Sequence, residues 1–424
     1  MSSMDFLEKL LDGVAVEWRA LGTLGGLVRG NGLQKKDFTE AGVPAIHYGQ
    51  IYTYYGLSTT ETKSFVSPEL ASQLKKVNKG DVVITNTSEN LEDVGKALVY
   101  LGDPQAVTGG HATIVKPGDN LLGKYFAYFT QTDKFAGEKR KYAKGTKVID
   151  VSASDMAKIL IPIPSPENPK KSLEIQAEIV RILDAFTELT AELTAELTAE
   201  LTARKKQYDY YRDQLLSFEE GEVEWKTLGE VATIQRGASP RPIAKYITDD
   251  EDGVPWIKIG DTSPGSKYVV GTAQKITPEG ARNSRILDKG DFIMSNSMSF
   301  GRPYILDITG AIHDGWASIG GFSRSLNSDY LYHYLSSNTV QNYWAGKINS
   351  GSVSNLNTDI IKTLPIPVPD LAEQEKIALI LDKFDALTNS ISEGLPREIE
   401  LRQKQYEYYR DLLLSFPSPE EVAA

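Results

Sequence analysis

The feature that most constrains this chain of 424 residues is an internal duplication. The segment Val16–Gly22, VEWRALG, returns as Val223–Gly229, VEWKTLG. Farther along, Arg204–Phe218, RKKQYDYYRDQLLSF, returns as Arg402–Phe416, RQKQYEYYRDLLLSF. Shorter matches lie between them: Val43–Ile46 with Val254–Ile257, Lys79–Asp81 with Lys289–Asp291, and Ile161–Pro164 with Ile366–Pro369. A period of this length indicates two copies of one structural unit that together fill the chain.

The second constraint is a long segment without helix breakers. Between Ser172 and Phe218 there is no Pro or Gly. Apolar residues mark one helical face of this segment: Ile175, Ile179, Ile182, Phe186, Leu189, Leu193, Leu197, Leu201 and Tyr208. A single helix of about 47 residues would span roughly 70 Å and would need a partner helix. The equivalent segment 371–416 supplies that partner, but Gly394 and Pro396 interrupt it, so we expect two consecutive helices there.

The rest of the sequence consists of short β-branched segments cut by Gly, Pro, Asn and Asp, as is typical of short strands and turns. One short helix is expected in each copy, near residues 121–132 and 329–343. The expected divisions are an N-terminal helical stub (1–18), two globular domains (19–165 and 223–369), a central spacer helix (166–222) and a C-terminal helical region (370–424). The start of the chain, FLEKLLDGVAVEW, also resembles DQLLSFEEGEVEW before the second copy, which indicates a circular repeat. The predicted fold is therefore α+β, with two mixed, β-rich domains separated by two long antiparallel helices in a pseudo-twofold tandem repeat.

Composition excludes several classes of site. The chain has no Cys and four His, so disulfides, thiol nucleophiles, iron–sulfur clusters and Cys-based zinc sites are excluded. The chain start lacks a signal peptide and no run of about 18 apolar residues occurs, which indicates a cytoplasmic protein. The net charge of −11 resides mainly in the helical segments, whereas residues 19–160 contain more Lys and Arg than Asp and Glu. Acidic helices repel DNA but suit a surface that meets protein.

Catalytic motifs are missing from the sequence. The segment Gly118–Tyr125, GDNLLGKY, matches most of a phosphate-binding loop, but Tyr125 replaces the Ser or Thr that would hold Mg²⁺. The start of a helix is the better interpretation of this segment. The acidic run Asp249–Asp252 is interpreted as a solvated turn and not as a cation site. We therefore expect no catalytic residue, no metal and no cofactor in this chain.

Polar and aromatic loops occur at equivalent places in the two copies, and their side chains have the donors and acceptors that read DNA bases. In the first copy the candidates are Lys35, Lys36, His47, Tyr48, Gln50, Asn86 and Thr87. In the second copy they are Arg236, Arg241, Lys258, Ser295, Asn296, Arg302, Lys347, Ser350 and Ser352. The segment 134–147 is a basic loop that could neutralise phosphates through Lys139, Arg140, Lys141, Lys144 and Lys147. The alternative for this segment is an ordinary solvated loop.

Taken together, these motifs resemble the DNA-specificity subunit of type I restriction-modification systems. The resemblance lies in VEW-x-x-LG, the IPIP and IPVP exits, ILDAF and ILDKF, QY-x-YYRD-x-LLSF, and TAELTAELTAEL at residues 190–201. The last motif is similar to the spacer of the TAEL-repeat subfamily. The resemblance implies two target-recognition domains, each reading one half of a split site on double-stranded DNA. The chain would then be a non-catalytic specificity subunit of a DNA methyltransferase and endonuclease complex.

The resemblance also implies partners. The helices would bind two methyltransferase subunits, which use S-adenosylmethionine, and two restriction/translocase subunits, which use ATP and Mg²⁺, would join through that methyltransferase core. On the helices, aromatic and apolar residues exceed what one helix–helix seam requires, although an internal core takes some of them. The candidates for partner binding are Tyr208, Tyr211, Leu215, Tyr406, Tyr409 and Leu413.

Two other functions stay open at the level of sequence. One is an enzyme that acts on DNA alone, which would need a catalytic motif. The other is a helical adaptor whose two β-rich domains bind carbohydrate or protein.

Overall fold

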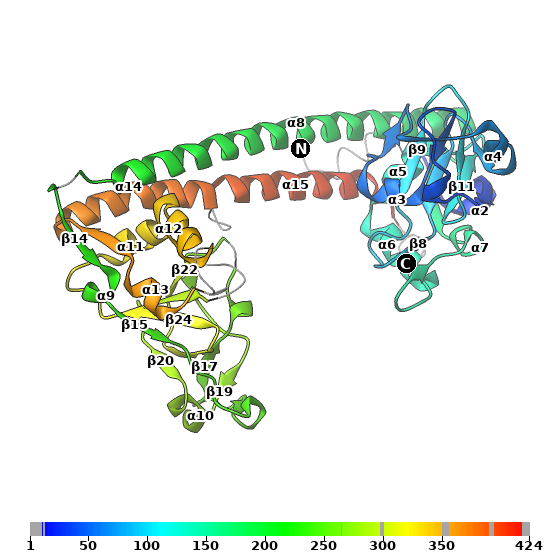
Figure 1. Ribbon diagram of the computed structural model, residues 1–424. Helices are drawn as coiled ribbons and strands as arrows, with labels where there is room; N and C mark the ends of the chain where they lie inside the picture. The colour runs from blue at the N-terminus through cyan, green and yellow to red at the C-terminus, as the bar shows by residue number, and fades with distance from the viewer. Residues whose placement is uncertain are drawn as a thin grey trace. The chain divides into compact units, whose positions relative to one another are not determined.

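The computed structural model describes residues 11, 13–219, 221–263, 265–296, 301–349, 356–389 and 394–417. The chain divides into two compact units, residues 1–192 with 403–424 and residues 193–402. We call them unit 1 and unit 2. Each unit combines one globular domain with parts of the long helices, and the class is α+β with two copies of one arrangement (Figure 1).

In the globular part of unit 1 the strands are β1 (Val16–Ala20), β2 (Gly25–Arg29), β3 (Val43–Ile46), β4 (Ser58–Thr59), β5 (Ser64–Val66), β6 (Lys75–Val77), β7 (Val82–Thr85), β8 (Thr87–Ser88), β9 (Ala97–Tyr100), β10 (Ala106–Thr108), β11 (Ala112–Pro117), β12 (Ile149–Asp150) and β13 (Leu160–Pro164). The helices are α2 (Leu21–Leu24), the 3₁₀ turn η1 (Lys35–Asp37), α3 (Tyr48–Thr53), α4 (Pro68–Gln73), α5 (Gly123–Phe129), α6 (Asp133–Tyr142) and α7 (Ala153–Met156). A five-stranded sheet has the order β2-β11-β7-β9-β4, and a four-stranded sheet has the order β5-β3-β10-β6.

In unit 2 the strands are β14 (Glu224–Thr227), β15 (Thr233–Arg236), β16 (Ile247–Thr248), β17 (Val254–Ile257), β18 (Tyr268–Val269), β19 (Lys275–Ile276), β20 (Arg285–Leu287), β21 (Phe292–Ser295), β22 (Pro303–Leu306), β23 (Gly310–Ile312), β24 (Trp316–Gly320) and β25 (Pro365–Val368). The shorter helices are α9 (Leu228–Val231), η2 (Ile243–Lys245), η3 (Ile259–Asp261), α10 (Pro278–Arg282), α11 (Ser328–Leu335), α12 (Asn338–Asn349) and α13 (Thr358–Lys362). The two larger sheets have the orders β15-β24-β21-β22-β18 and β16-β19-β17-β23-β20. They match the sheets of unit 1, except that the second sheet has an additional edge strand, β16.

The repeated sequence motifs pair with each other. In unit 1 the VEW strand β1 is antiparallel to the IPIP strand β13, with Trp18 opposite Pro162. In unit 2 the equivalent strands β14 and β25 pair in the same way, with Trp225 opposite Pro367. The first and last strands of each globular domain therefore pair with each other next to the long helices.

The long helices begin as their sequences indicate. Helix α8 runs over Pro169–Leu215, 47 residues, and the side chain of Asn168 caps it by accepting a hydrogen bond from the Lys171 amide. Helices α14 (Leu371–Asn389) and α15 (Gly394–Leu413) confirm the predicted break. Gly394 has a φ of +78°, and a Cβ there would lie 2.5 Å from the Ala386 carbonyl oxygen. Only glycine fits that position without strain.

Contacts in unit 1 agree with a circular repeat. The end of α15 brings Leu413, Leu414 and Phe416 into the same core as Trp18, and the Trp18 indole donates to the Pro417 carbonyl at 2.7 Å. In unit 2 the equivalent end of α8 places Leu216 in the core. Most of the predicted N-terminal stub lies outside the described residues, and its end at residues 16–18 is strand β1.

The helix expected near residues 121–132 is confirmed as α5, with the shorter bounds Gly123–Phe129. Two other local predictions were wrong. The helix expected at 329–343 is two helices, α11 and α12, separated near Ser336. The basic loop at 134–147 is largely helix α6, because the Thr132 side chain caps it and Asp133 and the last-turn cations complement the helix dipole.

Candidate nucleic-acid interface

Each globular domain has a short loop that crosses from one of its sheets to the other. In unit 1 the loop Gly109–His111 joins β10 to β11, and in unit 2 the loop His313–Gly315 joins β23 to β24. We call these the crossover loops. They are equivalent because β10 pairs in parallel with β3 in one domain and β23 pairs in parallel with β17 in the other.

The same side chains hold both crossover loops. The Nε of Arg29 donates to the Gly110 carbonyl at 3.1 Å, and the Nε of Arg236 donates to the Asp314 carbonyl at 3.2 Å. The residue after each arginine is glycine, and a Cβ on Gly30 or Gly237 would lie 2.1 Å from a loop carbonyl oxygen. This close approach requires glycine at both positions.

The opposite side of each loop is held by an asparagine. The backbone N–H of Asn86 donates to the His111 carbonyl at 2.9 Å, and the backbone N–H of Asn296 donates to the Gly315 carbonyl at 3.0 Å. Arg236 was predicted from the sequence as a candidate, but Arg29 was not. The Arg-Gly dipeptide at the end of the second strand of each domain, β2 and β15, is the signal that could have identified it.

Around the first crossover loop the surface is aromatic and basic. The rings of Tyr48 and His111 are 4.7 Å apart between centroids, and the rings of His47 and Tyr48 are 4.6 Å apart. Burial, together with Lys35 and His111 nearby, lowers the pKa of His47. Lys35 and Lys36 are exposed on η1, so this face offers cations and aromatic rings to a polyanion.

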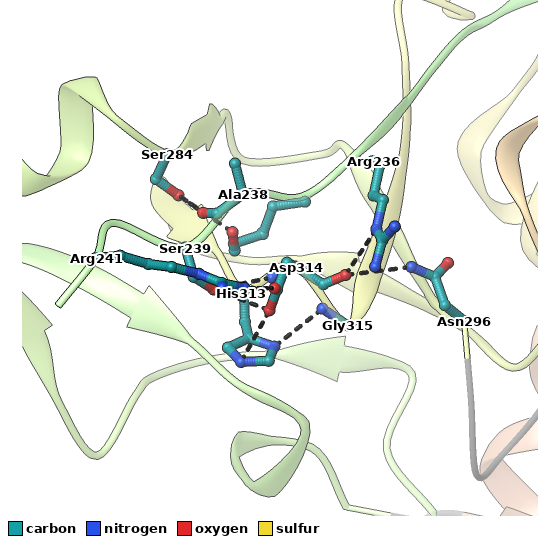
Figure 2. Close-up of polar contacts among 10 residues, drawn as sticks. Arg236, Ala238, Ser239, Arg241, Ser284, Asn296, His313, Asp314 and Gly315 are labelled. Atoms are coloured by element: carbon teal, nitrogen blue, oxygen red, sulfur yellow. Dashed lines mark hydrogen bonds and ion pairs between the residues drawn. The ribbon is translucent and has the colours of Figure 1, made fainter. Parts of the chain in front are cut away.

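The second crossover loop has different chemistry (Figure 2). The carboxylate of Asp314 accepts from the Ser239 hydroxyl at 2.9 Å and lies 3.3 Å from an Arg241 nitrogen and 3.1 Å from the His313 ring. Although partial burial raises it, these donors leave the pKa of Asp314 below its usual range. The Arg241 side chain is 83% exposed. A hollow of 660 Å³ beside Asp314 is lined by Arg241 and Trp256.

Several predicted DNA contacts are not on the surface. Asn86 is buried, and its side chain donates to the Val151 carbonyl and accepts from the Thr113 hydroxyl. His47 and Ser295 are also buried, and Gln50 is half-buried, with its amide donating to Ser64 at 2.6 Å. These side chains have the right donors for bases, but folding has already used or enclosed them.

Because much of the basic segment is helical, some of its cationic side chains are buried and others are exposed. Lys139 is buried, and its ammonium donates to the carbonyls of Glu92 and Val94 at 2.8 and 2.7 Å. Burial lowers the pKa of Lys139 to about 8, so it supports the domain and is not available to a phosphate. Arg140 and Lys147 are exposed, and Lys144 pairs with Asp155 at 2.9 Å. Lys141 is exposed and lies 2.6 Å from Glu138.

The remaining candidates are spread through the domains. The Thr87 hydroxyl is 3.0 Å from the His111 ring, which places Thr87 beside the first crossover loop. Lys258 donates to Gln274 at 2.7 Å. The cationic groups of Arg302 and Lys347 lie over the rings of Tyr304 and Tyr343. Ser350 and Ser352 lie outside the described residues.

The helical candidates also separate by burial. Tyr208 and Leu413 are buried in the cores of unit 2 and unit 1, which corrects their assignment as partner-binding residues. Leu215 packs against the unit 2 core, and Tyr406 is half-buried. Tyr211 and Tyr409 are partly exposed, while their neighbours Tyr210 and Tyr408 are 64% and 60% exposed. The outward tyrosines are therefore Tyr210 and Tyr408.

Metal-binding clusters and membrane-spanning helices can also be considered in the part of the chain that the structure describes. Within the described ranges, no cluster of three or more His, Cys, Asp or Glu side chains is arranged to hold a metal ion. None of the helices in those ranges is both long and apolar enough to cross a membrane.

Comparison with known proteins connects this geometry to a family. The family model described as the type I restriction modification DNA specificity domain matches twice, at residues 15–203 and 220–401. The chain is 39% identical to the Escherichia coli type I restriction enzyme EcoR124I/EcoR124II specificity subunit over the full length of both. It is 34% identical to a putative type I restriction enzyme specificity subunit of Haemophilus influenzae, covering 97% of this chain and 98% of the relative.

Solved structures share the fold. A chain from a type I restriction-modification system has a TM-score of 0.68 at 17% identity, covering 94% of this chain and 97% of that one. The HsdS subunit from Thermoanaerobacter tengcongensis has a TM-score of 0.52 at 16% identity, with 94% and 96% covered. The two matches to the family model coincide with the two copies of the repeat, and the full-length relatives are named specificity subunits, not catalytic ones. The chain belongs to the family of type I restriction-modification specificity subunits and carries two target-recognition domains.

Proposed function

We propose that each globular domain reads one half of a bipartite site on double-stranded DNA. The observation that carries this proposal is the pair of crossover loops, which have one frame but different side chains. The first loop contains His111, whose ring lies beside Tyr48, whereas the second contains Asp314, which pairs with Arg241. A shared frame with different donors and acceptors is what two readers of different base sequences require.

The test is a domain exchange. Replacing residues 19–160 with the matching domain of a relative should change one half of the methylated motif and leave the other half intact. Methylome sequencing of cells that carry the whole system reads both halves at once. A change in both halves together would contradict independent reading.

The proposal includes the partners. The helices would recruit two methyltransferase subunits, and two restriction/translocase subunits would join through them. S-adenosylmethionine, ATP and Mg²⁺ would be used by those partners, in the cytoplasm, where bacterial DNA lies. The outward Tyr210 and Tyr408 support a protein-binding role for the helices, because exposed aromatic rings are enriched where proteins meet.

Exchange of Tyr210 and Tyr408 for Ala should therefore reduce co-purification of the methyltransferase subunit without unfolding the chain. The matched control is Tyr54→Ala, which removes a tyrosine of the first globular domain that is 58% exposed. Full assembly of the Tyr210→Ala, Tyr408→Ala double variant would contradict this role.

The TAEL segment is proposed as a spacer of defined length. Thr194–Leu197 is one repeat within α8. Four helical residues advance about 6 Å and turn about 400°, a net rotation of about 40°. One DNA base pair turns about 35°, since 10 to 10.5 base pairs complete a turn. The rotations nearly match if α8 runs roughly along the DNA axis.

Deleting Thr194–Leu197 should therefore shorten the gap between half-sites by one base pair and leave both half-site sequences unchanged. Methylome sequencing measures the gap directly. Efficient methylation at the original spacing, or a shift of two base pairs, would contradict the spacer role.

A further inference from the structure

We propose that Arg29 and Arg236 form an equivalent pair of phosphate-binding residues, one in each globular domain. Each arginine would hold the DNA backbone beside its crossover loop. This inference rests on the proposed function, because it assumes that both domains bind duplex DNA.

The equivalence of the two arginines follows from strand register. Arg29 ends β2 opposite Thr113 of β11, and Arg236 ends β15 opposite Ala317 of β24. In both domains the glycine after the arginine donates its amide to the first residue of that central strand, Ala112 or Trp316, at 2.9 and 2.8 Å. The two side chains therefore leave their sheets at the same point.

The bonds to the loops orient both side chains. Each guanidinium uses Nε to reach a loop carbonyl, at 3.1 Å for Arg29 and 3.2 Å for Arg236. That bond fixes the plane of the guanidinium without using its two terminal amino groups. Both residues are exposed. A fixed guanidinium loses little rotational freedom when it binds two phosphate oxygens.

The terminal amino groups differ in what they contact. For Arg29, a terminal nitrogen lies 3.5 Å from Asp150. For Arg236, no partner of the terminal nitrogens occurs among the described residues. Figure 2 shows Arg236 and Asn296 on one side of Asp314 and Arg241 on the other, where the Asp314 carboxylate already meets Ser239 and Arg241. That carboxylate is thus neutralised by other groups.

Phosphate is the ligand that fits this pattern best. Residues that read different bases should differ between the domains, as the crossover loops do. Arg29 and Arg236 share their strand position and their bond to the loop, although Arg29 also lies near Asp150. This shared placement suits the part of DNA that every sequence has in common. Exposed cations nearby, Lys35 in one domain and Arg241 in the other, increase the attraction for a polyanion.

The experiment compares full-length Arg29→Gln, Arg236→Gln and wild-type chains, with the methyltransferase subunit present, on two short duplexes. One duplex carries the bipartite sequence that the complex methylates, and the other lacks that sequence. Each variant should lower the slope of log affinity against log salt by about 0.9 and weaken binding to both duplexes by a similar factor, roughly fivefold to tenfold. Arg181→Gln is the matched control, because it removes an exposed arginine paired with Glu178 on α8, and its slope should stay at the wild-type value.

Several outcomes would overturn the inference. A loss confined to the target duplex would make these arginines base readers, and an unchanged salt slope would leave them as loop supports. Arg236→Lys separates charge from structure, because it keeps the charge but not the fixed guanidinium. Arg236→Lys and Arg236→Gln chains with equal slopes would also overturn it, provided circular dichroism shows both folded. If wild-type complex binds neither duplex, the proposed function itself fails; if wild type binds and the variants match it, only this inference fails.

Discussion

Each unit attaches its globular domain to a long helix through an equivalent aspartate, but the residues that contact this aspartate differ between the units. In unit 1 the carboxylate of Asp184, on α8, accepts from the Tyr128 hydroxyl at 2.7 Å and from Lys124 at 2.8 Å. In unit 2 the carboxylate of Asp382, on α14, meets the His333 ring at 2.9 Å and Lys267 at 2.7 Å. These aspartates are the shared third residues of ILDAF and ILDKF.

A tyrosine from the repeated QY-x-YYRD motif completes each network. In unit 1 Tyr406 of α15 accepts from the Thr187 hydroxyl at 3.0 Å. In unit 2 Tyr208 of α8 bonds to His333 at 2.9 Å. Thus each domain is attached to the helix that follows it and to the end of the other long helix, within one unit.

The networks differ in how much they bury. His333 is fully buried between Tyr208 and Asp382, and Lys267 is 11% exposed and also pairs with Asp329 at 2.6 Å. In unit 1 Lys124 is 24% exposed and Asp184 is 40% exposed. Loss of a hydrogen-bond partner costs more free energy for a buried polar group than for an exposed one. The two networks can therefore share one geometry and still contribute different free energies of stabilisation.

The largest effect is expected for His333→Ala. The substitution leaves a cavity and removes a hydrogen-bond partner from both Tyr208 and Asp382, so the free energy of unfolding of unit 2 should fall by about 3 kcal/mol. Tryptophan fluorescence during urea unfolding measures this chiefly for unit 2, which contains Trp225, Trp256, Trp316 and Trp344, whereas Trp18 is in unit 1.

His333→Gln is the control for this prediction, because the glutamine amide can still donate a hydrogen bond toward Asp382 and its side chain fills more of the cavity than alanine does. It should cost less than His333→Ala. Equal losses for both variants would show that the hydrogen bonds contribute little.

The next effect concerns acid. Burial raises the pKa of Asp382, but the bonds from His333 and Lys267 outweigh it and leave the pKa below its usual range. A carboxyl with a lowered native pKa contributes stability that is complete above its unfolded pKa, about 3.9, and is lost as pH falls through the native pKa. Below about pH 4, unit 2 of wild type should therefore lose stability more steeply than unit 2 of Asp382→Asn.

The measurement is the urea midpoint by tryptophan fluorescence from neutral pH down to acid. Asp382→Asn should start with lower stability at neutral pH and show the shallower decline. Parallel declines for the two proteins would contradict the assignment of this acid sensitivity to Asp382. Asp252→Asn, in an exposed turn of unit 2, is the matched control.

A smaller effect is expected for Tyr128→Phe in unit 1. The ring stays in the core, but the hydroxyl no longer donates to Asp184, so unfolding of unit 1 should cost about 1 kcal/mol less. Hydrogen exchange of the α5 amides reports this unit separately from unit 2. A loss of stability as large as that of His333→Ala would show that the two networks do not differ in their contribution to stability.

The helical frame could be predicted from the sequence because the sequence signals for it are long or repeated. The absence of Pro and Gly predicted α8, Gly394 predicted the helix break, and the VEW and IPIP motifs mark the strands that pair. None of these requires knowledge of tertiary contacts.

The candidate site was less predictable, since it depends on which short strands pair and in what register. Asn86 has the donors of a base reader but faces Val151 and Thr113 inside the domain. Arg29 was not predicted as a candidate, and its place beside the crossover loop follows from the pairing of β2 with β11. Thr132 and Asp133 before the basic segment are typical of the start of a helix. The many Lys and Arg residues that follow favoured the interpretation as a loop.

The smallest expected effect tests whether the cation of unit 1 is as important as that of unit 2. Lys124→Met keeps the aliphatic stem and removes a partly exposed ion pair with Asp184, which still accepts from Tyr128, so unit 1 should lose only about 0.5 kcal/mol. Lys267→Met leaves Asp329 and Asp382 without their shared cation in a more buried setting, so its loss should be several times larger. Raising the salt concentration should reduce the Lys124 effect further, because solvent screens exposed pairs more than buried ones. Equal losses for the two lysine variants, or a Lys124 effect insensitive to salt, would mean that the two networks carry the same energetic weight despite their different burial.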